Sequence, residues 1–248
     1  MTTVATGTYT YQDKKLGDTT PLVVETAPDV FYPTSTTVLL LRATRRILTP
    51  APVTTLDLGC GCGCGVVALA MATHLPAGST VAGSDLSANA VGLTSRNAAQ
   101  LGLPVECRAG SLFEPWEGRR FDLIVDDVSG VSDVVAESSG WFPLGVPGDA
   151  GRDGTRWICQ VLEQTPRYLA PGGRLVFPVL TLSDESRILE CARQHFATVE
   201  LLDEQWYPLT DSLEALAPLL AELEAEGLIT LRRQGSRTLW AAKIYLAQ

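Results

Sequence analysis

Three alternating glycines behind an acidic residue are the part of this 248-residue chain best suited to chemistry. Asp57 and Leu58 end a short β-favouring segment, and an apolar, helix-favouring segment begins near Val66. A glycine turn between a strand and a helix lets a ligand lie against the N–H groups of the helix N-terminus. Glycine also permits positive φ and has no Cβ to hold a ligand away. We therefore expect a binding site built from Asp57, Gly59, Cys60, Gly61 and Gly63.

A second acidic residue makes this signal more specific. Residues 81–84 are typical of a strand, and Asp85 follows it, 22 residues after Gly63. In a βαβ unit such a residue lies beside the glycine loop, where its carboxylate can accept hydrogen bonds from both hydroxyls of a ribose. The pair predicts a cofactor site of the nucleoside type.

The rest of the chain alternates strands and helices and ends in a hairpin signal at residues 234–237. This order predicts an α/β fold, a Rossmann-like doubly wound sheet of seven strands, mostly parallel with an antiparallel C-terminal hairpin strand. Ligands of such sheets lie beyond the carboxyl ends of the strands. Several polar side chains are expected at those ends: Asp57, Asp85, Ser111, Asp126 and Asp127.

Composition and charge narrow the classes of partner. The net charge is −9, which repels phosphate backbones, so we expect no nucleic-acid partner. There is no secretory signal and no apolar run of membrane-spanning length, so we expect no membrane partner. Three of the six cysteines lie in the glycine loop, but a fourth metal ligand is not evident, so we expect no metal. Reduced thiols indicate the cytoplasm.

Together these residues resemble the class I S-adenosylmethionine (SAM)-dependent methyltransferases over residues 30–246. The resemblance implies SAM as the cofactor, an N-terminal cap segment at residues 1–35 and a SAM-binding domain at residues 36–248. It also implies that the strand and turn at residues 105–113 hold the adenine and that Asp126 lies near the sulfonium. The implied cofactor-binding residues are Asp57, Gly59, Cys60, Gly61, Gly63, Asp85, Leu86, Gly110, Ser111, Leu112 and Asp126.

Within that family the chain is most similar to the glutamine methyltransferases that act on release factors and ribosomal proteins. Residues 33–40 resemble their Pro-Arg-Pro-Glu-Thr-Glu-Leu-Leu segment. However, their Asn-Pro-Pro-Tyr motif is replaced by Asp127-Val128-Ser129-Gly130. An ionised acid cannot donate a hydrogen bond to an amide carbonyl, and the stacking tyrosine is absent. We therefore do not expect glutamine or adenine to be the methyl acceptor.

The remaining chemistry rests on acids and aromatic rings. Asp126 and Asp127 are candidates to remove a proton from the methyl acceptor, because they follow the strand nearest the expected sulfonium. Aromatic faces stabilise a sulfonium by cation–π attraction. Tyr32 is therefore a third catalytic candidate, and the candidate substrate-binding residues are Phe31, Tyr32, Trp141 and Phe142. Residues 129–154 read as a long loop, which is typical of a functional lid.

Three functions follow from this interpretation. The first is a SAM-dependent methyltransferase that acts on a small molecule in secondary metabolism, as a monomer or homodimer. The second is a cyclase whose only substrate is SAM itself, with the amine attacking the γ-carbon to give azetidine-2-carboxylic acid and methylthioadenosine. The third is a non-catalytic SAM-binding partner or regulatory subunit, which predicts an exposed apolar face on a helix at residues 212–226. The spacing Asp57-x-Gly-x-Gly-x-Gly speaks against a nicotinamide-dependent dehydrogenase.

Overall fold

The computed structural model describes residues 7–59, 65–128, 130–142, 146 and 148–248. Its contacts divide the chain into two compact units. The first unit comprises Met1–Asp127 with Arg167–Val176, and the second comprises Val128–Pro166 with Phe177–Gln248. Among the described residues, no helix has the length and apolar character needed to cross a membrane.

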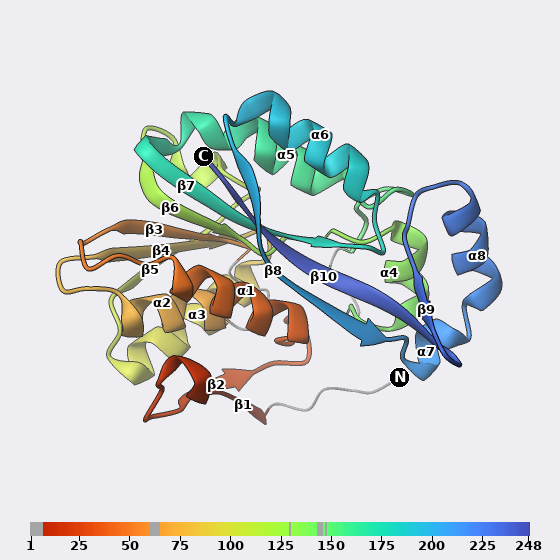
Figure 1. The fold of residues 1–248 in the computed structure, drawn as a ribbon. Coiled ribbons are helices and arrows are strands. Elements are labelled where there is room, and N and C mark those ends of the chain that lie inside the picture. Colours follow the sequence, from red (N-terminus) through yellow and green to blue (C-terminus); the bar gives the residue numbers. More distant parts are fainter. Residues whose placement is uncertain (1–6, 60–64, 129, 143–145, 147) are drawn as a thin grey trace. The chain divides into compact units, whose positions relative to one another are not determined.

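A parallel sheet forms the centre of the first unit (Figure 1). Its strand order is β5-β4-β3-β6-β7, and β7 continues into the second unit. Leu58, the last residue of β3, lies opposite both Ser84 in β4 and Asp126 in β6. The carboxyl ends of the central strands are therefore level with one another. The strands are β3 (Thr54–Leu58), β4 (Thr80–Asp85), β5 (Val105–Ala109), β6 (Phe121–Asp126) and β7 (Leu169–Leu180).

Three helices of the first unit gather on one side of this sheet (Figure 1). They are α1 (Ser35–Arg46), α2 (Val66–His74) and α3 (Ala88–Leu101), and a short 3₁₀ turn, η2 (Glu114–Trp116), precedes β6. Helix α1 starts with a capping box, in which the side chains of Thr34 and Thr37 each accept a hydrogen bond from the other's backbone N–H. Helix α2 is buried from Val66 to Met71, because nearly all of its residues are apolar.

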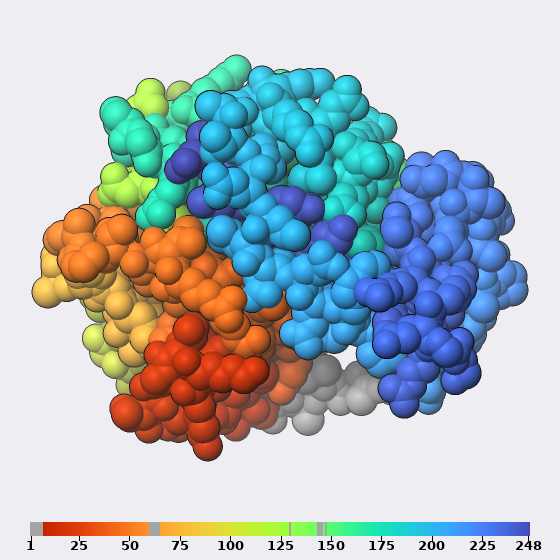
Figure 2. Space-filling model, viewed as in Figure 1, coloured from red at the N-terminus to blue at the C-terminus, as the bar shows by residue number. Residues whose placement is uncertain are grey.

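The N-terminal hairpin expected from the sequence is present. Strands β1 (Gly7–Tyr11) and β2 (Leu22–Thr26) pair antiparallel as a separate two-stranded sheet, with the 3₁₀ turn η1 (Lys14–Leu16) between them. The buried side chain of Asn97 on α3 accepts from Glu25 N (2.8 Å) and donates to Glu25 O (3.1 Å), which satisfies the outer edge of β2. The hairpin and α1 lie side by side on the surface in Figure 2.

The second unit is built around an antiparallel group of strands. It consists of the end of β7, then β10 (Arg237–Ala247) and β8 (Val199–Pro208), while β9 (Arg232–Gln234) also pairs with β10. Helices α5 (Arg156–Gln164) and α6 (Glu185–His195) pack on each other. The remaining helices are α4 (Asp133–Ser139), α7 (Asp211–Glu214) and α8 (Ala217–Ala225), and the turn η3 (Thr165–Arg167) follows α5.

The fold class is confirmed: an α/β fold with a mostly parallel sheet and antiparallel strands at its C-terminal end. Three local details differ from expectation. Among the described residues the large sheet has eight strands instead of the expected seven, because the short β9 also pairs with β10. The segment 129–154 is not wholly loop, because α4 buries Val135 and Ala136. Residues 170–173 do not precede the strand but bulge within β7, since Phe121 pairs with Leu169 and Leu123 with Arg174. The division at residue 35 stays a prediction.

The expected helix at residues 212–226 is also divided. It breaks between α7 and α8, where Pro218 lacks the N–H that a continuous helix needs. Leu213, Leu220 and Leu223 are buried, with at most 1% of their surface exposed. These three side chains belong to the core of the second unit. The prediction of an exposed apolar face, which a partner subunit would need, is therefore wrong at these positions.

Candidate functional site

Backbone hydrogen bonds tie together the carboxyl ends of the four neighbouring strands β3, β4, β5 and β6. Gly59 N donates to Ser84 O (2.8 Å), Gly110 N to Asp85 O (2.9 Å) and Asp127 N to Leu58 O (2.9 Å). Gly59 has a φ of 84°, a value that favours glycine. The parallel ladder therefore continues past the strand ends, and the acidic residues at these ends lie at fixed positions.

Asp57, at the end of β3, has no exposed surface. Its Oδ2 accepts from Ala68 N (2.9 Å) in the first turn of α2, and its Oδ1 has no hydrogen-bond partner within the described part of the chain. Burial, and then repulsion from Asp127, raises the pKa of Asp57 well above its usual range, and Asp85 and Asp126 add to this rise. Four carboxylates therefore share one electrostatic environment, which favours a positively charged ligand.

The loops after β4 and β5 contain the residues expected to bind ribose and adenine. Asp85 Oδ1 accepts from Ser87 N (2.7 Å), which orders the start of α3, and Leu86 is exposed. Gly110 lies against Pro115, so that a Cβ there would be 2.5 Å from its ring. Leu112 has a φ of 45°, which is uncommon for a residue with a side chain. Backbone strain of this kind concentrates at ligand sites.

Asp126 and Asp127 lie at the end of β6, as the sequence predicts. Asp126 has no exposed surface, whereas Asp127 is 6% exposed. The hydroxyl of Thr37 on α1 lies 3.3 Å from Asp127 Oδ2 and donates to it. Both acids are buried, Asp127 slightly less than Asp126, and the N-terminal turn of α1 holds Asp127.

The aromatic candidates are not brought to one place within either unit. Tyr32 packs edge-on against Tyr9 of β1, with ring centroids 5.5 Å apart, and Phe31 is half-buried beside it in sequence. Trp141 and Phe142 belong to the second unit, where the Trp141 ring lies 5.4 Å from that of Trp240. Their roles, and that of Tyr32 in catalysis, stay predictions.

Part of the glycine loop is not covered by the structure. Cys60, Gly61 and Gly63 lie outside the described residues. At the end of the loop, Gly65 has a φ of 77°, and a Cβ there would be 2.4 Å from Thr94. Glycine is therefore also required at position 65, two residues beyond the last glycine of the expected motif.

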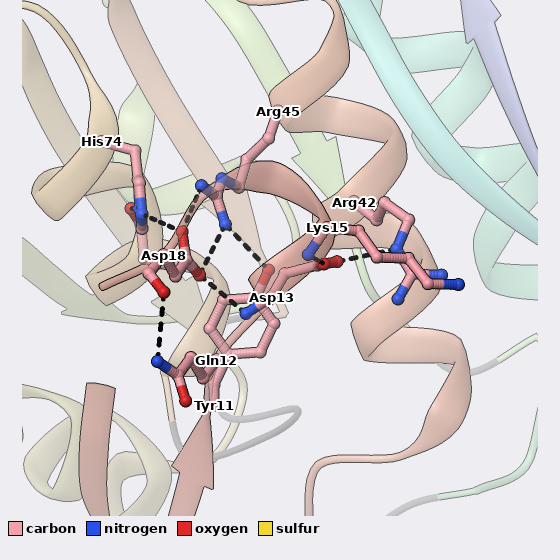
Figure 3. Close-up of polar contacts among 9 residues, drawn as sticks. Tyr11, Gln12, Asp13, Lys15, Asp18, Arg42, Arg45 and His74 are labelled. Atoms are coloured by element: carbon pink, nitrogen blue, oxygen red, sulfur yellow. Dashed lines mark hydrogen bonds and ion pairs between the residues drawn. The ribbon is translucent and has the colours of Figure 1, made fainter. Parts of the chain in front are cut away.

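A second polar cluster, which sequence reasoning missed, attaches the N-terminal hairpin to α1 and α2 (Figure 3). The two oxygens of Asp18 accept from Arg45 at 2.6 and 3.0 Å, and Oδ1 lies 3.1 Å from His74 Nε2. Asp13 accepts from Arg42 Nε at 2.7 Å. We call Asp13, Asp18, Arg42, Arg45 and His74 the cap clamp. Its members come from three segments that are far apart in sequence and form no motif, so only the fold reveals it.

Comparisons with known proteins agree with this geometry. Residues 26–127 match the family model of the methyltransferase small domain. A release factor glutamine methyltransferase from Geobacter sulfurreducens is 36% identical over 115 residues, which cover 43% of this chain and 39% of the relative. The chain thus spans about two fifths of the length of this curated relative.

Solved structures extend the likeness in fold over nearly the whole chain. A T. thermophilus 16S rRNA N2 G1207 methyltransferase, in complex with AdoMet and guanosine, has a TM-score of 0.62 at 16% identity, covering 98% of this chain and 50% of that chain. The E. cuniculi Mtq2-Trm112 complex, responsible for the methylation of the eRF1 translation termination factor, has a TM-score of 0.55 at 15% identity, covering 89% and 99%. Residues 26–127 are therefore similar to the methyltransferase small domain, and the chain shares its fold with these two solved structures.

The comparisons overturn the expectations about partners. The predictions of a small-molecule partner and of no nucleic-acid partner were wrong, because these similar proteins act on ribosomal RNA or on termination and release factors. These relatives give no support to a role in secondary metabolism. The physical reason is that net charge averages over the whole surface. The first unit, which holds the candidate site, has twelve acidic and eleven basic side chains and is nearly neutral.

Proposed function

We propose that this protein is a SAM-dependent methyltransferase that transfers a methyl group to a nitrogen atom of a protein. The observation that carries this proposal is the group of four carboxylates, Asp57, Asp85, Asp126 and Asp127, at the carboxyl ends of β3, β4 and β6 inside a methyltransferase small domain. The activity, the substrate and the partner of the whole protein are all part of the proposal.

The cofactor fits the residues that are present. SAM, when bound, supplies a methyl group on a positively charged sulfur that leaves as a neutral thioether. The negative potential of Asp57, Asp126 and Asp127 suits the positive charges of its sulfonium and ammonium groups. Asp85 has the position to accept hydrogen bonds from the ribose hydroxyls, and the backbone of Gly110–Leu112 lies beside it for the adenine. Binding is thus expected to relieve the mutual repulsion of the carboxylates.

A protein acceptor is favoured over RNA by two observations. The release factor methyltransferase is 36% identical, whereas the rRNA methyltransferase is 16% identical and supports the fold alone. In addition, the second unit carries sixteen acidic and eight basic side chains, so that eight of the nine net negative charges lie there. Such a charge attracts basic protein segments.

The acceptor atom follows from the chemistry of Asp127. An ionised carboxylate only accepts hydrogen bonds, so it binds a group with N–H donors. As the nitrogen attacks the methyl carbon, an N–C bond forms and the C–S bond breaks. The proton that the nitrogen releases passes to the carboxylate of Asp127, which acts as the base. The remaining contribution of the protein is to hold the nitrogen in line with the C–S bond.

The test is a labelling experiment with SAM that carries a tritiated methyl group. The purified protein is incubated with SAM alone, with a cell extract treated with ribonuclease, and with the same extract treated with protease. We expect label in protein that survives ribonuclease and disappears with protease. Asp127→Asn should lower the rate of labelling at least about 100-fold, because the base is lost.

Other outcomes identify the competing functions. Label in RNA would replace the protein acceptor with RNA. Methylthioadenosine formed from SAM alone would support the cyclase. Tight binding of SAM without any turnover would support a non-catalytic SAM-binding subunit.

A further inference from the structure

Thr37 connects the start of α1 to the end of β6. Its side chain has no exposed surface and occupies the third position of the helix. Its Oγ1 lies 3.3 Å from Thr34 N, 3.4 Å from Thr34 Oγ1 and 3.3 Å from Asp127 Oδ2. Ninety residues of sequence separate Thr37 from Asp127. One hydroxyl therefore links the capping box of α1 to the acid that we assign as the base.

The direction of these hydrogen bonds follows from the groups involved. A backbone N–H only donates, so Thr37 Oγ1 accepts from Thr34 N. An ionised carboxylate only accepts, so the single hydrogen of the Thr37 hydroxyl goes to Asp127 Oδ2. The interaction is consequently made with the charged form of Asp127 and favours it.

The surroundings of Asp127 make this donor important. Asp57 on β3 and Asp127 repel each other, and Asp85 on β4 and Asp126 on β6 also act on Asp57. Asp57, when charged, therefore favours the protonated form of Asp127. Helix α1 has no acidic residue in its first turn, and its N-terminus carries a positive partial charge. Helix α1 therefore contributes two influences that favour the carboxylate, the Thr37 hydroxyl and the positive end of the helix.

We propose that Thr37 is a positioning residue: its hydroxyl keeps Asp127 ionised and fixes the orientation of the carboxylate that receives the acceptor proton. This inference rests on the proposed function. It also gives the capping box of α1 a second purpose, since the bond from Thr34 N orients the Thr37 hydroxyl toward Asp127. The sequence contained a signal, because Thr37 lies within residues 33–40, but nothing in the sequence pairs it with Asp127.

The experiment compares four variants. Thr37→Val removes the hydroxyl at nearly constant volume, and Thr37→Ser restores it. Thr34→Ala removes the other capping hydroxyl without touching Asp127. Thr44→Val is the matched control, because Thr44 lies on the same helix, is equally buried, and its Oγ1 has no hydrogen-bond partner among the described residues.

The first readout needs no acceptor. The carboxyl carbon of Asp127 is titrated by NMR in each variant, and the affinity for SAM is measured by calorimetry. We expect the titration midpoint of Asp127 to rise by about one pH unit in Thr37→Val, a tenfold change in proton affinity. It should return in Thr37→Ser and stay at the wild-type value in Thr34→Ala and Thr44→Val. SAM affinity should change less than about threefold in all four variants.

The second readout is the rate of methyl transfer into the ribonuclease-treated protein extract. For Thr37→Val we expect kcat about tenfold lower, an unchanged KM for SAM, and an acidic limb of the pH profile shifted to higher pH. A merely structural role would lower the thermal stability without moving the midpoint or the limb. An unchanged Asp127 midpoint in folded Thr37→Val overturns the inference. Failure of the wild-type protein to label any protein would instead overturn the proposed function, and the Asp127 titration would still test the Thr37 contact.

Discussion

The cap clamp predicts a measurable loss of stability when its central charge is removed. Asp18→Asn keeps the size of the side chain but removes the charge that pairs with Arg45. Both side chains are nearly buried, with 4% of Asp18 and 8% of Arg45 exposed. The hydrogen bonds from Arg45, and further ones from the backbone and His74, hold the pKa of Asp18 at about 2, below its ordinary 3.8.

The magnitude follows from that shift. A difference of about 1.8 pH units at 1.36 kcal/mol per unit corresponds to about 2 kcal/mol of stability at neutral pH. The variant also leaves Arg45 with only neutral partners at this position, so we expect a total loss of about 2–3 kcal/mol. For a chain of this size the melting temperature should fall by about 5–10 °C.

The assay is urea unfolding of the wild type and Asp18→Asn at several pH values. Because the folded-state pKa of Asp18 is depressed, its contribution is complete above pH 3.8 and disappears as the pH falls through about 2. The two proteins should therefore converge between pH 4 and pH 2. Asp149→Asn is the control, since Asp149 pairs with Arg156 at an exposed position and its loss should lower the stability much less than that of Asp18. Equal stability of Asp18→Asn and wild type at pH 7 would refute the clamp.

Two further predictions concern the acidic site and a glycine turn. The pKa of Asp57 is raised by burial and by its acidic neighbours, so the folded state loses stability as the pH rises above the ordinary range of an aspartate. Asp57→Asn should therefore raise the free energy of unfolding, measured with urea at pH 7, by about 1–2 kcal/mol. The same variant should bind SAM at least about tenfold more weakly. A less stable variant with normal affinity for SAM would contradict this. Gly154→Ala should cost about 2–4 kcal/mol, because its φ is 70° and a Cβ would be 2.7 Å from Ser132 N and Ser183 Cβ. In Gly172→Ala, which has a φ of 76° but open space, the cost measured by thermal unfolding should be about 1 kcal/mol, and equal costs would contradict the steric argument.

The fold could be predicted from sequence because its signals are local. The glycine loop after Asp57 and the apolar strand before Asp126 each lie within a few residues, and the alternation of strands and helices fixes a parallel sheet. Parallel strands then bring their carboxyl ends together, so the nearness of Asp57, Asp85 and Asp126 followed from topology alone. The structure agrees with that placement.

What could not be predicted depends on contacts between distant segments. The Thr37–Asp127 hydrogen bond spans 90 residues, and Asp18 and His74 are 56 residues apart. Neither pair has a spacing that a local pattern can reveal. The helix α4 was hidden because its buried residues are few and lie among glycine, serine and acidic residues. Nucleic acid was wrongly excluded because the net charge of the whole chain concealed the difference between a nearly neutral first unit and an acidic second unit.

The central claim is that the carboxyl ends of β3, β4 and β6 form a SAM site. Calorimetric titration with SAM and with its demethylated product tests it most directly, using wild type and Asp85→Ala. We predict one binding site in the wild type and affinity at least about tenfold weaker in Asp85→Ala, because the ribose hydroxyls lose their acceptor. No binding heat in the wild type, or equal affinity in the variant, would contradict the account.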